Sequence, residues 1–570
     1  MKKAILLLLL ISSHVSFFNT SQAQSFQWLT RMGGPDSDPN FGPDEWVRDI
    51  EVDADGNVYA CGRIRSIADF DGVPVTTYGG YDMFLCKYDC HGNLVWVKTA
   101  GGLDEDDAGD LVLDNIGHIY LTGRISSTPN RPCTFFDTTF TDVHVDMFLA
   151  KFDTSGNYMW IKAAGTAAIS GGSRGFRVLL DSNGQPVVSF GSSPGLLFPG
   201  WNTTEPNTAP YVSRFDTSGI MQSIFTPSAD FSVTFVLNSM DSQDNYIING
   251  YFDGDSALVG NQTLYNPKPG FYTMWVSKFN NAGILQWVYM FDDTTSIINA
   301  SLSYGTTTDS ADNIYVTGDA SPSLKCGNYV FTDPIPPLAI SPFIIKLTPQ
   351  GQPVWATQAY TKYQGFNKGG VALKTNSYLN FSGTYNTKAV FGSDTLMGSM
   401  AGSLDLFIAE VDPNGNMLGA VKLGCTGGYD VDSYVTKVDA NDNVYIAGNF
   451  EGTLTAGTHS VQSAGGYSDG FIAKYGYNCT TGISQDLTAA TVASISVWPN
   501  PVAGGAAATF ATAITNGSYS VINMMGLEVA IGTFQKGKGT ISTQALAAGV
   551  YTVVIQGQSN TGTARLVVVE

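Results

Sequence analysis

The feature that most constrains this chain is a pattern that occurs seven times. A turn followed by a strand ending in glycine is written DADGNVYACG, DNIGHIYLTG, DSNGQPVVSFG, DSQDNYIING, DSADNIYVTG, TNSYLNFSG and DANDNVYIAG. A second landmark is an apolar strand that ends in a charged residue before a turn, at Lys87, Lys151, Arg214, Lys278, Lys346, Glu410 and Lys474. Both landmarks recur about every 64 residues, which indicates seven copies of one structural unit.

Each unit contains four short segments typical of strands. In the first unit they are WVRDIEV, NVYACGRI, MFLCKYD and NLVWVKTA. Apolar residues alternate with polar ones, and Asp, Asn and Gly separate the segments, so we expect antiparallel strands joined by turns. No segment shows sustained helical periodicity, and helix should be nearly absent. Seven four-stranded units predict an all-β fold, a seven-bladed β-propeller.

The two ends of the repeat array complement each other. The seventh unit stops near residue 478 after its third strand, whereas QWLTRMGG at 27–34 has the sequence of a fourth strand. We therefore predict that this N-terminal strand completes the seventh unit and closes the ring, which also hides a sheet edge. Trp28 would then correspond to Trp96, Trp160, Trp287 and Trp355, and we expect these tryptophans to pack between blades rather than to form a ligand cage.

The units resemble the β-propeller repeat family abbreviated SBBP. Its pattern of D-x-x-G-N-x-Y, then F-x-x-K-x-D-x-x-G and a tryptophan, is visible in the segments quoted above. This resemblance implies a propeller fold and a surface location, but no single activity.

The chain's ends carry export features. Residues 1–23 have two lysines, a short apolar run and small residues before a cleavage point, as in a secretory signal peptide. Residues 24–478 are the predicted propeller, 479–492 a polar linker, and 493–570 a small C-terminal β-sandwich. This last segment resembles the type A sorting domain of the type IX secretion system of Bacteroidetes. The matching positions are Pro499, Asn500, Pro501, Gly549, Tyr551 and Arg565.

That second resemblance implies a partner and a location. The partner would be the type IX secretion machinery, and the chain would be secreted or held on the outer cell surface. The formal net charge of −20 argues against nucleic acid as a partner, because phosphates would be repelled. No later segment is apolar enough to cross a membrane, and we expect a soluble monomer after removal of the leader.

Catalytic signatures are absent from the sequence. No HExxH, GxSxG, P-loop or CxxC pattern occurs, and the acidic pairs recur in every unit, as structural motifs do. We therefore expect a binding or structural module for an unidentified extracellular protein or glycan, without an activity of its own. The alternative is an exported enzyme, such as a glycan-cleaving propeller, with a carboxylate site in the central channel. Long, variable connections on one face are where we expect a ligand to bind.

The cysteines and the acidic loops supply two further predictions. Cys90 and Cys479 both follow third strands, in the first and seventh units, so ring closure would bring them together as a disulfide, while Cys61 and Cys86 should be buried free thiols. Acidic loops allow two interpretations: ordinary solvated turns with no cofactor, which we favour, or a calcium site, because several carboxylates spaced closely within neighbouring loops can supply oxygen ligands. The candidate ligands are Asp36, Asp38, Asp44, Asp104, Asp106 and Asp107.

Overall fold

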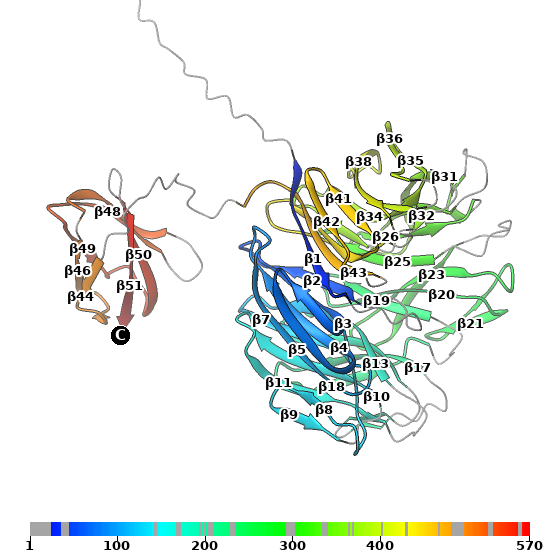
Figure 1. Cartoon of the computed structure of the whole chain (residues 1–570), viewed down its shortest axis with the longest axis horizontal. Helices are drawn as coiled ribbons and strands as arrows, with labels where there is room; N and C mark the ends of the chain where they lie inside the picture. The colour runs from blue at the N-terminus through cyan, green and yellow to red at the C-terminus, as the bar shows by residue number, and fades with distance from the viewer. Residues whose placement is uncertain are drawn as a thin grey trace, which may run out of the picture. The chain divides into compact units, whose positions relative to one another are not determined.

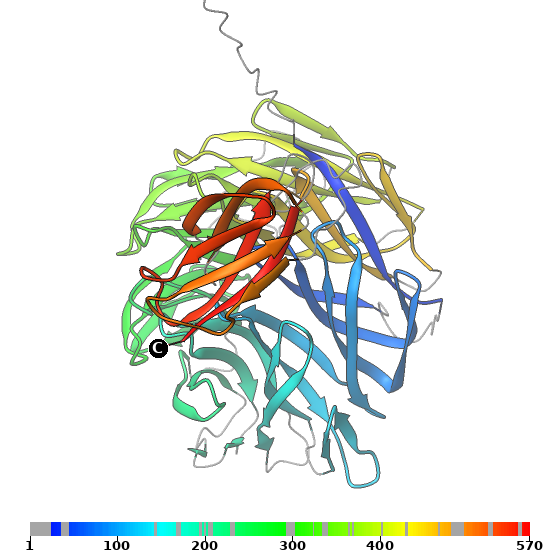
Figure 2. The same ribbon diagram turned by 90° about the vertical axis from the view of Figure 1, so that its left-hand side faces the viewer.

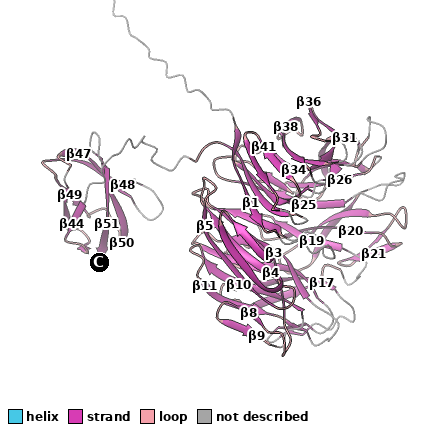
Figure 3. Ribbon diagram, in the orientation of Figure 1, coloured by secondary structure: helices cyan, strands magenta, loops and turns pink. Residues whose placement is uncertain are grey.

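The computed structural model is built from strands and turns, and no described residue lies in a helix (Figure 1, Figure 3). It divides into two compact bodies, an N-terminal body of residues 1–479 and a C-terminal body of residues 480–570. The structure describes residues 24–35, 45–141, 145–166, 173–192, 196–198, 201–202, 209–228, 234–291, 302–322, 324–332, 340–362, 365–366, 370–400, 403–427, 431–464, 468–479, 495–512, 514–522, 528–556 and 561–569.

Within these ranges, the main strands of the N-terminal body pair as antiparallel sets of four, one set for each repeat. The first three sets are β2 (Trp46–Val52), β3 (Val58–Phe70), β4 (Val73–Tyr88) and β5 (Leu94–Gly102); β6 (Asp107–Leu113), β7 (His118–Ser126), β10 (Val145–Asp153) and β11 (Tyr158–Ala163); and β13 (Ser173–Leu180), β14 (Pro186–Ser192), β17 (Ala209–Phe215) and β18 (Met221–Phe225).

The remaining sets follow the same order. They are β19 (Thr234–Met240), β20 (Tyr246–Phe252), β23 (Thr273–Phe279) and β24 (Leu285–Met290); β25 (Leu302–Thr308), β26 (Ile314–Ala320), β29 (Ser341–Leu347) and β30 (Pro353–Gln358); β33 (Val371–Leu373), β34 (Leu379–Asn386), β37 (Leu404–Val411) and β38 (Met417–Thr426); and β39 (Val431–Val438), β40 (Val444–Phe450), β43 (Asp469–Gly476) and β1 (Ser25–Gly33). In Figure 2 the sheets of this body succeed one another around an axis in chain order.

The turn between the first and second strands explains the repeated aspartate. The Asp53 carboxylate accepts hydrogen bonds from the backbone N–H groups of Asp55 and Asn57, at 3.0 and 2.9 Å. Gly56 within this turn has φ of +78°, a left-handed conformation that glycine adopts without a Cβ clash. In the fifth unit Asp312 takes this place with φ of +60°, and its carboxylate accepts hydrogen bonds from Ser242 of the preceding unit. That contact offsets the conformational cost of the left-handed backbone.

The tryptophans pack against the next sheet, as predicted. A Cβ added to the turn glycine of the following unit would meet the ring of the preceding unit's fourth-strand aromatic residue, which shows how closely the two elements approach. These contacts join Trp28 to Gly92, Trp96 to Gly156, Trp160 to Gly219, Phe225 to Gly283, Trp287 to Gly351 and Trp355 to Gly415. In the third unit, where Ser223 stands at the tryptophan position, Phe225 two residues later fills this role.

The predicted pairing of the N-terminal strand is confirmed. β1 pairs antiparallel with β43, and Trp28 lies opposite Lys474. The Arg31 guanidinium binds the buried Asp469 carboxylate at 2.7 Å. The far end of β1 also pairs with β3 of the first unit, where Met32 lies opposite Phe70. The first strand of the chain thus completes the last sheet and contacts the first.

Most connections between second and third strands contain a short hairpin. These hairpins are β8 (Cys133–Phe135) with β9 (Thr138–Phe140), β15 (Leu196–Phe198) with β16 (Trp201–Asn202), β21 (Ser256–Val259) with β22 (Gln262–Tyr265), β27 (Lys325–Cys326) with β28 (Tyr329–Val330), β35 (Lys388–Phe391) with β36 (Asp394–Met397), and β41 (Thr453–Ala456) with β42 (His459–Gln462). Several pair with the preceding unit. β8 pairs with β5, and β41 with β38. β15 and β35 pair with the short strands β12 (Gly165–Thr166) and β31 (Tyr360–Lys362), which follow the fourth strands of the preceding units. One further short strand, β32 (Gly365–Phe366), pairs with β34.

The C-terminal body has eight strands among its described residues. They are β44 (Ile495–Trp498), β45 (Val502–Ala503), β46 (Ala507–Thr512), β47 (Asn516–Ile522), β48 (Glu528–Gln535), β49 (Lys538–Ser542), β50 (Gly549–Gln556) and β51 (Thr561–Val569), paired in the order β44-β46-β49-β48-β47-β50-β51-β45. β44 also contacts β51, so this continuous sheet curves around a core that contains Phe510, Val553 and Leu566.

Candidate functional site

The first strand of each repeat lies innermost, and these strands contact one another in a closed cycle. β2 contacts β6, which contacts β13, and the series continues through β19, β25, β33 and β39 back to β2. In most units a β-bulge interrupts the pairing of this inner strand with the second strand, and Arg48 in β2 and Tyr434 in β39 are the extra residues. A bulge turns a side chain away from the regular pleat, which makes these positions suited to a site.

The inner strands surround a cavity of about 1090 Å³. Every one of the seven contributes lining residues, and the turns at 114–116, 181–184 and 241–244 line it as well. These turns are the tight first-to-second turns of the second, third and fourth units. The cavity is therefore lined at the face of the tight turns, whereas the sequence led us to expect a ligand on the face of the long connections.

Charged side chains occupy one arc of the cavity wall. The Arg177 guanidinium on β13 binds Asp110 of β6 at 2.8 Å and lies 4.0 Å from Asp49 of β2. The Lys437 ammonium on β39 binds Glu51 at 2.5 Å and lies 3.8 Å from the same Asp49. Asp49 and Asp110 are almost fully buried, whereas the side chains of Arg177 and Lys437 keep 27% and 29% exposure. Arg177, Lys437 and Glu51, whose side chain keeps 23% exposure, are therefore the charged groups of this cluster that a ligand in the cavity can reach.

Burial and mutual attraction set the protonation of this ionic cluster. Burial raises the pKa of Glu51, although Lys437 opposes that shift. Burial also raises the pKa of Asp110, and the nearby Asp49 raises it further. The pKa of Arg177 is raised because attraction to Asp110 and Asp49 outweighs burial. The same balance raises the pKa of Lys437. Both cations consequently remain charged at neutral pH.

The strands that line the rest of the cavity wall present uncharged side chains. β19 and β25 present Asn238, Ser239, Thr306 and Thr307, and the hydroxyl oxygens of Ser239 and Thr306 lie 2.7 Å apart. Hydroxyl and amide groups both donate and accept hydrogen bonds, which suits a ligand rich in hydroxyl groups. The cavity can thus hold a polar molecule between a charged arc and a neutral arc.

The residues predicted to bind calcium have separate surroundings. Asp36, Asp38 and Asp44 lie outside the described residues. Asp104 pairs with Arg131 at 2.7 Å, and Asp107 lies 3.1 Å from Arg174. Asp106 accepts hydrogen bonds from the backbone N–H groups of Gly102 and Ser126. Calcium binding at these positions stays a prediction.

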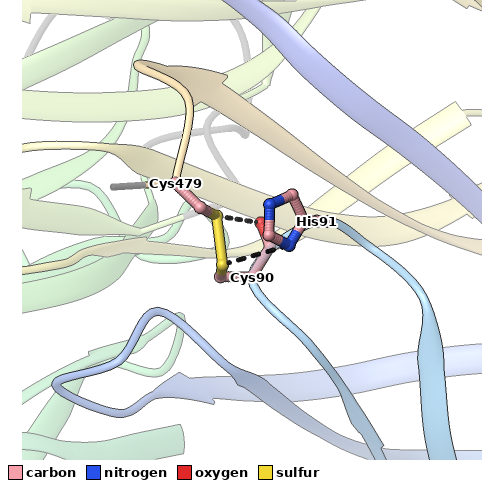
Figure 4. A group of neighbouring side chains, drawn as sticks. All are labelled: Cys90, His91 and Cys479. Atoms are coloured by element: carbon pink, nitrogen blue, oxygen red, sulfur yellow. Dashed lines mark hydrogen bonds between the residues drawn. A yellow bond between two sulfur atoms is a disulfide. The ribbon is translucent and has the colours of Figure 1, made fainter. Parts of the chain in front are cut away.

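The predicted disulfide between Cys90 and Cys479 is confirmed (Figure 4). Their Cα atoms are 5.9 Å apart, and the His91 ring lies beside the Cys90 sulfur. With His91 these cysteines form the only described group close enough to share a metal ion, but sulfurs joined in a disulfide offer no thiolate ligand. The free cysteines Cys61 and Cys86 are buried, as expected.

The predicted sorting residues take structural places in the C-terminal body. The Asn500 side-chain oxygen accepts a hydrogen bond from the backbone N–H of Val567 at 2.8 Å, and the Tyr551 hydroxyl donates one to the Ala547 carbonyl at 2.8 Å. Pro499 and Pro501 lie in the segment between β44 and β45. Gly549 begins β50, and Arg565 pairs with Thr552 within the β50–β51 hairpin.

Comparison with protein families identifies this body. Residues 496–569 match the secretion system C-terminal sorting domain, the class predicted from its motifs. The chain is therefore exported through the type IX secretion system, either to the cell surface or into the medium. Among the described residues, no helix has both the length and the apolar character needed to cross a membrane.

Other relatives are more distant. The regulatory protein FlaEY of Caulobacter vibrioides is 24% identical over 289 residues, which cover 46% of this chain and 27% of FlaEY. The chain thus spans about a quarter of that curated relative. A fungal alcohol oxidase of the AA5 family, in complex with copper, aligns over 96% of this chain and 100% of its own, with 11% identity and a TM-score of 0.37.

One similar structure belongs to a type IX secretion component. PorZ, a bacterial surface component of that system in Porphyromonas gingivalis, aligns over 91% of each chain with 9% identity and a TM-score of 0.16. TM-scores this low assign neither a fold nor an activity to the present chain.

The charged residues of the cavity were not predicted, although the sequence contains a signal for them. Asp49, Asp110 and Arg177 stand four residues before the turn aspartate in the first three units. The fourth, fifth and seventh units have Leu237, Gly305 and Val435 there. A charge that appears in only part of a repeat array indicates a local role, because the fold itself needs no charge at that position.

Proposed function

We propose that the N-terminal body is a seven-bladed β-propeller and that it acts, after export, as a binding module. The closed cycle of inner strands supports the ring, as does the pairing of β1 with β43. The packing of six fourth-strand aromatic residues against the units that follow them supports a repeated blade, although the sixth unit has Gly419 in place of the aromatic residue. Residues 1–23 would direct passage across the inner membrane as a signal peptide, and the sorting domain would direct the later step.

The observation that carries the binding role is the cavity within the ring. Its volume of about 1090 Å³ lies near the upper end of the range for small-ligand sites, which is about 300–1000 Å³. Its wall combines fixed charges with neutral hydrogen-bonding groups. We propose that a polar, hydroxyl-rich ligand such as an oligosaccharide occupies it.

Calorimetric titration of the full chain with neutral and acidic oligosaccharides tests this role. The variant Glu51→Gln with Lys437→Met removes both charges of one pair, so that neither partner is left buried alone. We expect the double variant to keep its unfolding midpoint within a few degrees and to lose about tenfold in affinity for whichever saccharide binds. Unchanged affinity in the double variant would contradict a ligand site in the cavity.

The alternative function, an exported enzyme, is favoured by one observation. Asp49, Glu51 and Asp110 bring three carboxyl groups to one arc of the wall, and burial raises the pKa of two of them, as for a general acid. Incubation with polysaccharides, followed by measurement of new reducing ends, tests it. An activity present in the native chain and lost in Asp110→Asn would establish the enzyme.

A further inference from the structure

Arginine is distributed unevenly along this acidic chain. After Arg214 the next arginine is Arg565, so most arginines belong to the first three units. Five of these arginines and two aromatic residues lie near the start of the inner strands in the first three units. We call this group the arginine–aromatic stack; its members are Trp46, Arg48, Arg63, Arg65, Tyr81, Arg124 and Arg174.

Guanidinium groups and rings alternate within the stack. The guanidinium carbons of Arg48 and Arg63 lie 3.9 and 4.2 Å from the centroid of the Trp46 ring. Arg63 also lies 4.1 Å from the Tyr81 centroid, so it is held between two rings. Trp46 and Arg63 are direct partners across β2 and β3, and Arg48 is the extra residue of the bulge. The backbone therefore fixes this alternation.

The stack has more positive than negative charge. Asp107 lies 3.1 Å from Arg174 and 3.5 Å from Arg124, and Glu105 pairs with Arg124. Burial, followed by repulsion from Arg174, lowers the pKa of Arg48 to about 9. Burial also lowers the pKa of Arg63. Within the described part of the chain, the Nε groups of Arg48 and Arg63 and the Trp46 indole N–H donate no hydrogen bond. A bound oxyanion beside the guanidinium groups would relieve the repulsion among them.

We propose that the arginine–aromatic stack binds the carboxylate or sulfate groups of an acidic saccharide. This inference rests on the proposed binding role and names its ligand class. Arginine matches oxyanions with two parallel N–H donors, and stacking on rings orients the guanidinium groups in advance. Tyr434, whose ring centroid lies 5.8 Å from that of Trp46, also lines the cavity, so the stack adjoins the cavity wall.

The overall charge narrows the choice of anion. A net charge of −20 repels densely charged polymers such as nucleic acid over about 10 Å at moderate salt. A saccharide that carries isolated anionic groups on a neutral frame avoids most of this repulsion. Its hydroxyl groups can also form hydrogen bonds with the hydroxyl and amide groups of the cavity wall.

The test is titration of the full chain at constant ionic strength with four probes. They are an oligogalacturonate, which carries carboxylates, a κ-carrageenan oligosaccharide, which carries sulfates, neutral cellohexaose, and hexaglutamate. We expect one or both acidic saccharides to bind and Arg63→Gln to weaken that binding at least about tenfold. Arg131→Gln is the matched control, because it removes the same charge from an exposed pair with Asp104. It should change affinity less than about twofold.

Other outcomes separate the two proposals. If Arg63→Gln lowers the unfolding midpoint, a loss of affinity could reflect damage to the fold. Arg48→Gln is then titrated in its place and should weaken saccharide binding to a similar extent. Failure of both acidic saccharides to bind, equal weakening by Arg63→Gln and Arg131→Gln, or equally tight binding of hexaglutamate would overturn the inference. Cellohexaose binding that depends on Glu51 and Lys437 would then still support the cavity. If Arg63→Gln weakens saccharide binding but the double variant Glu51→Gln with Lys437→Met does not, the result would support the stack and contradict a ligand site in the cavity.

Discussion

At the residue scale, a reversed ion pair shows that one contact of the repeat can be kept while its residue types are exchanged. In the third, fourth and fifth units the turn aspartate pairs with the basic residue that ends the third strand, as Asp241 does with Lys278 at 2.5 Å. In the sixth unit both signs are exchanged, and Lys374 binds Glu410 at 2.6 Å. The two landmarks could be predicted from the sequence. Their pairing could not, because antiparallel register brings together positions that are far apart in the chain.

Reversing one member of this pair should destabilise the body. Glu410→Lys places two cations together, with the Lys374 side chain only 5% exposed. We expect a loss of about 1–3 kcal/mol in the free energy of unfolding. Adding Lys374→Asp gives the arrangement found in the fourth and fifth units and should recover most of the loss. Urea unfolding of the two single variants and the double variant measures the coupling, and additive effects would contradict the pairing.

Two buried carboxyl groups predict a pH dependence of stability. Burial raises the pKa of Asp82 and of Asp106 to about 7, from an ordinary value of 3.8. Between these values the folded chain holds protons that the unfolded chain has released. The stabilising contribution is therefore complete below about pH 4 and is lost as the pH rises to about 7.

The double variant Asp82→Asn with Asp106→Asn checks this dependence. Its unfolding free energy should fall less between pH 5 and pH 8 than that of the native chain, as measured in urea, while Asp55→Asn at an exposed turn should follow the native chain. Parallel curves for the double variant and the native chain would show that these groups do not titrate in the window.

At the element scale, several connections between second and third strands join neighbouring units. Their irregular lengths led us to expect ligand-binding loops, which stays a prediction, because the sequence shows no common pattern in them. The structure pairs several of them with the preceding unit, and Leu454 of β41 is buried beside Leu423 and Cys425 of β38. Apolar residues alternate only briefly in such short strands, so their pairing could not be read from periodicity.

Removing one of these hairpins should weaken the junction between two units. Replacing residues 453–462 by a two-residue turn would expose the end of β38 and its buried Leu423. We expect a loss of about 3–5 kcal/mol in unfolding free energy, close to the cost of deleting large buried side chains. Insertion of Gly-Ser-Gly between Gly457 and Thr458, at the tip, is the control and should cost less than about 1 kcal/mol. Equal costs for deletion and insertion would argue against the junction.

At the scale of the whole molecule, closure is both non-covalent and covalent. β1 joins the last unit to the first, and the disulfide between Cys90 and Cys479 ties the end of the N-terminal body to the first unit across 389 residues of sequence. Both could be predicted from the missing strand of the seventh unit. The ionic cluster and the arginine–aromatic stack could not, since they join residues from three or more units.

The disulfide should add measurable stability. Cys479→Ser, or reduction of the native chain, should lower the unfolding free energy by about 2–4 kcal/mol, because a long loop in the unfolded chain is no longer closed. Cys326→Ser, which removes a buried free thiol, is the control. Reductant should lower its unfolding free energy as much as it lowers that of the native chain. A native chain whose urea midpoint is the same with and without reductant would contradict this contribution.

Closure of the ring by β1 is tested by deleting residues 24–34 from a chain that already lacks residues 1–23. The deletion removes Trp28 from its contact with Gly92 and leaves the edge of β43 unpaired. We expect a large fall in the unfolding midpoint, or aggregation through the open edge, and partial recovery when a peptide of residues 24–34 is added. If the truncated chain unfolds at the native midpoint, and the added peptide does not change that midpoint, closure by this strand would be contradicted.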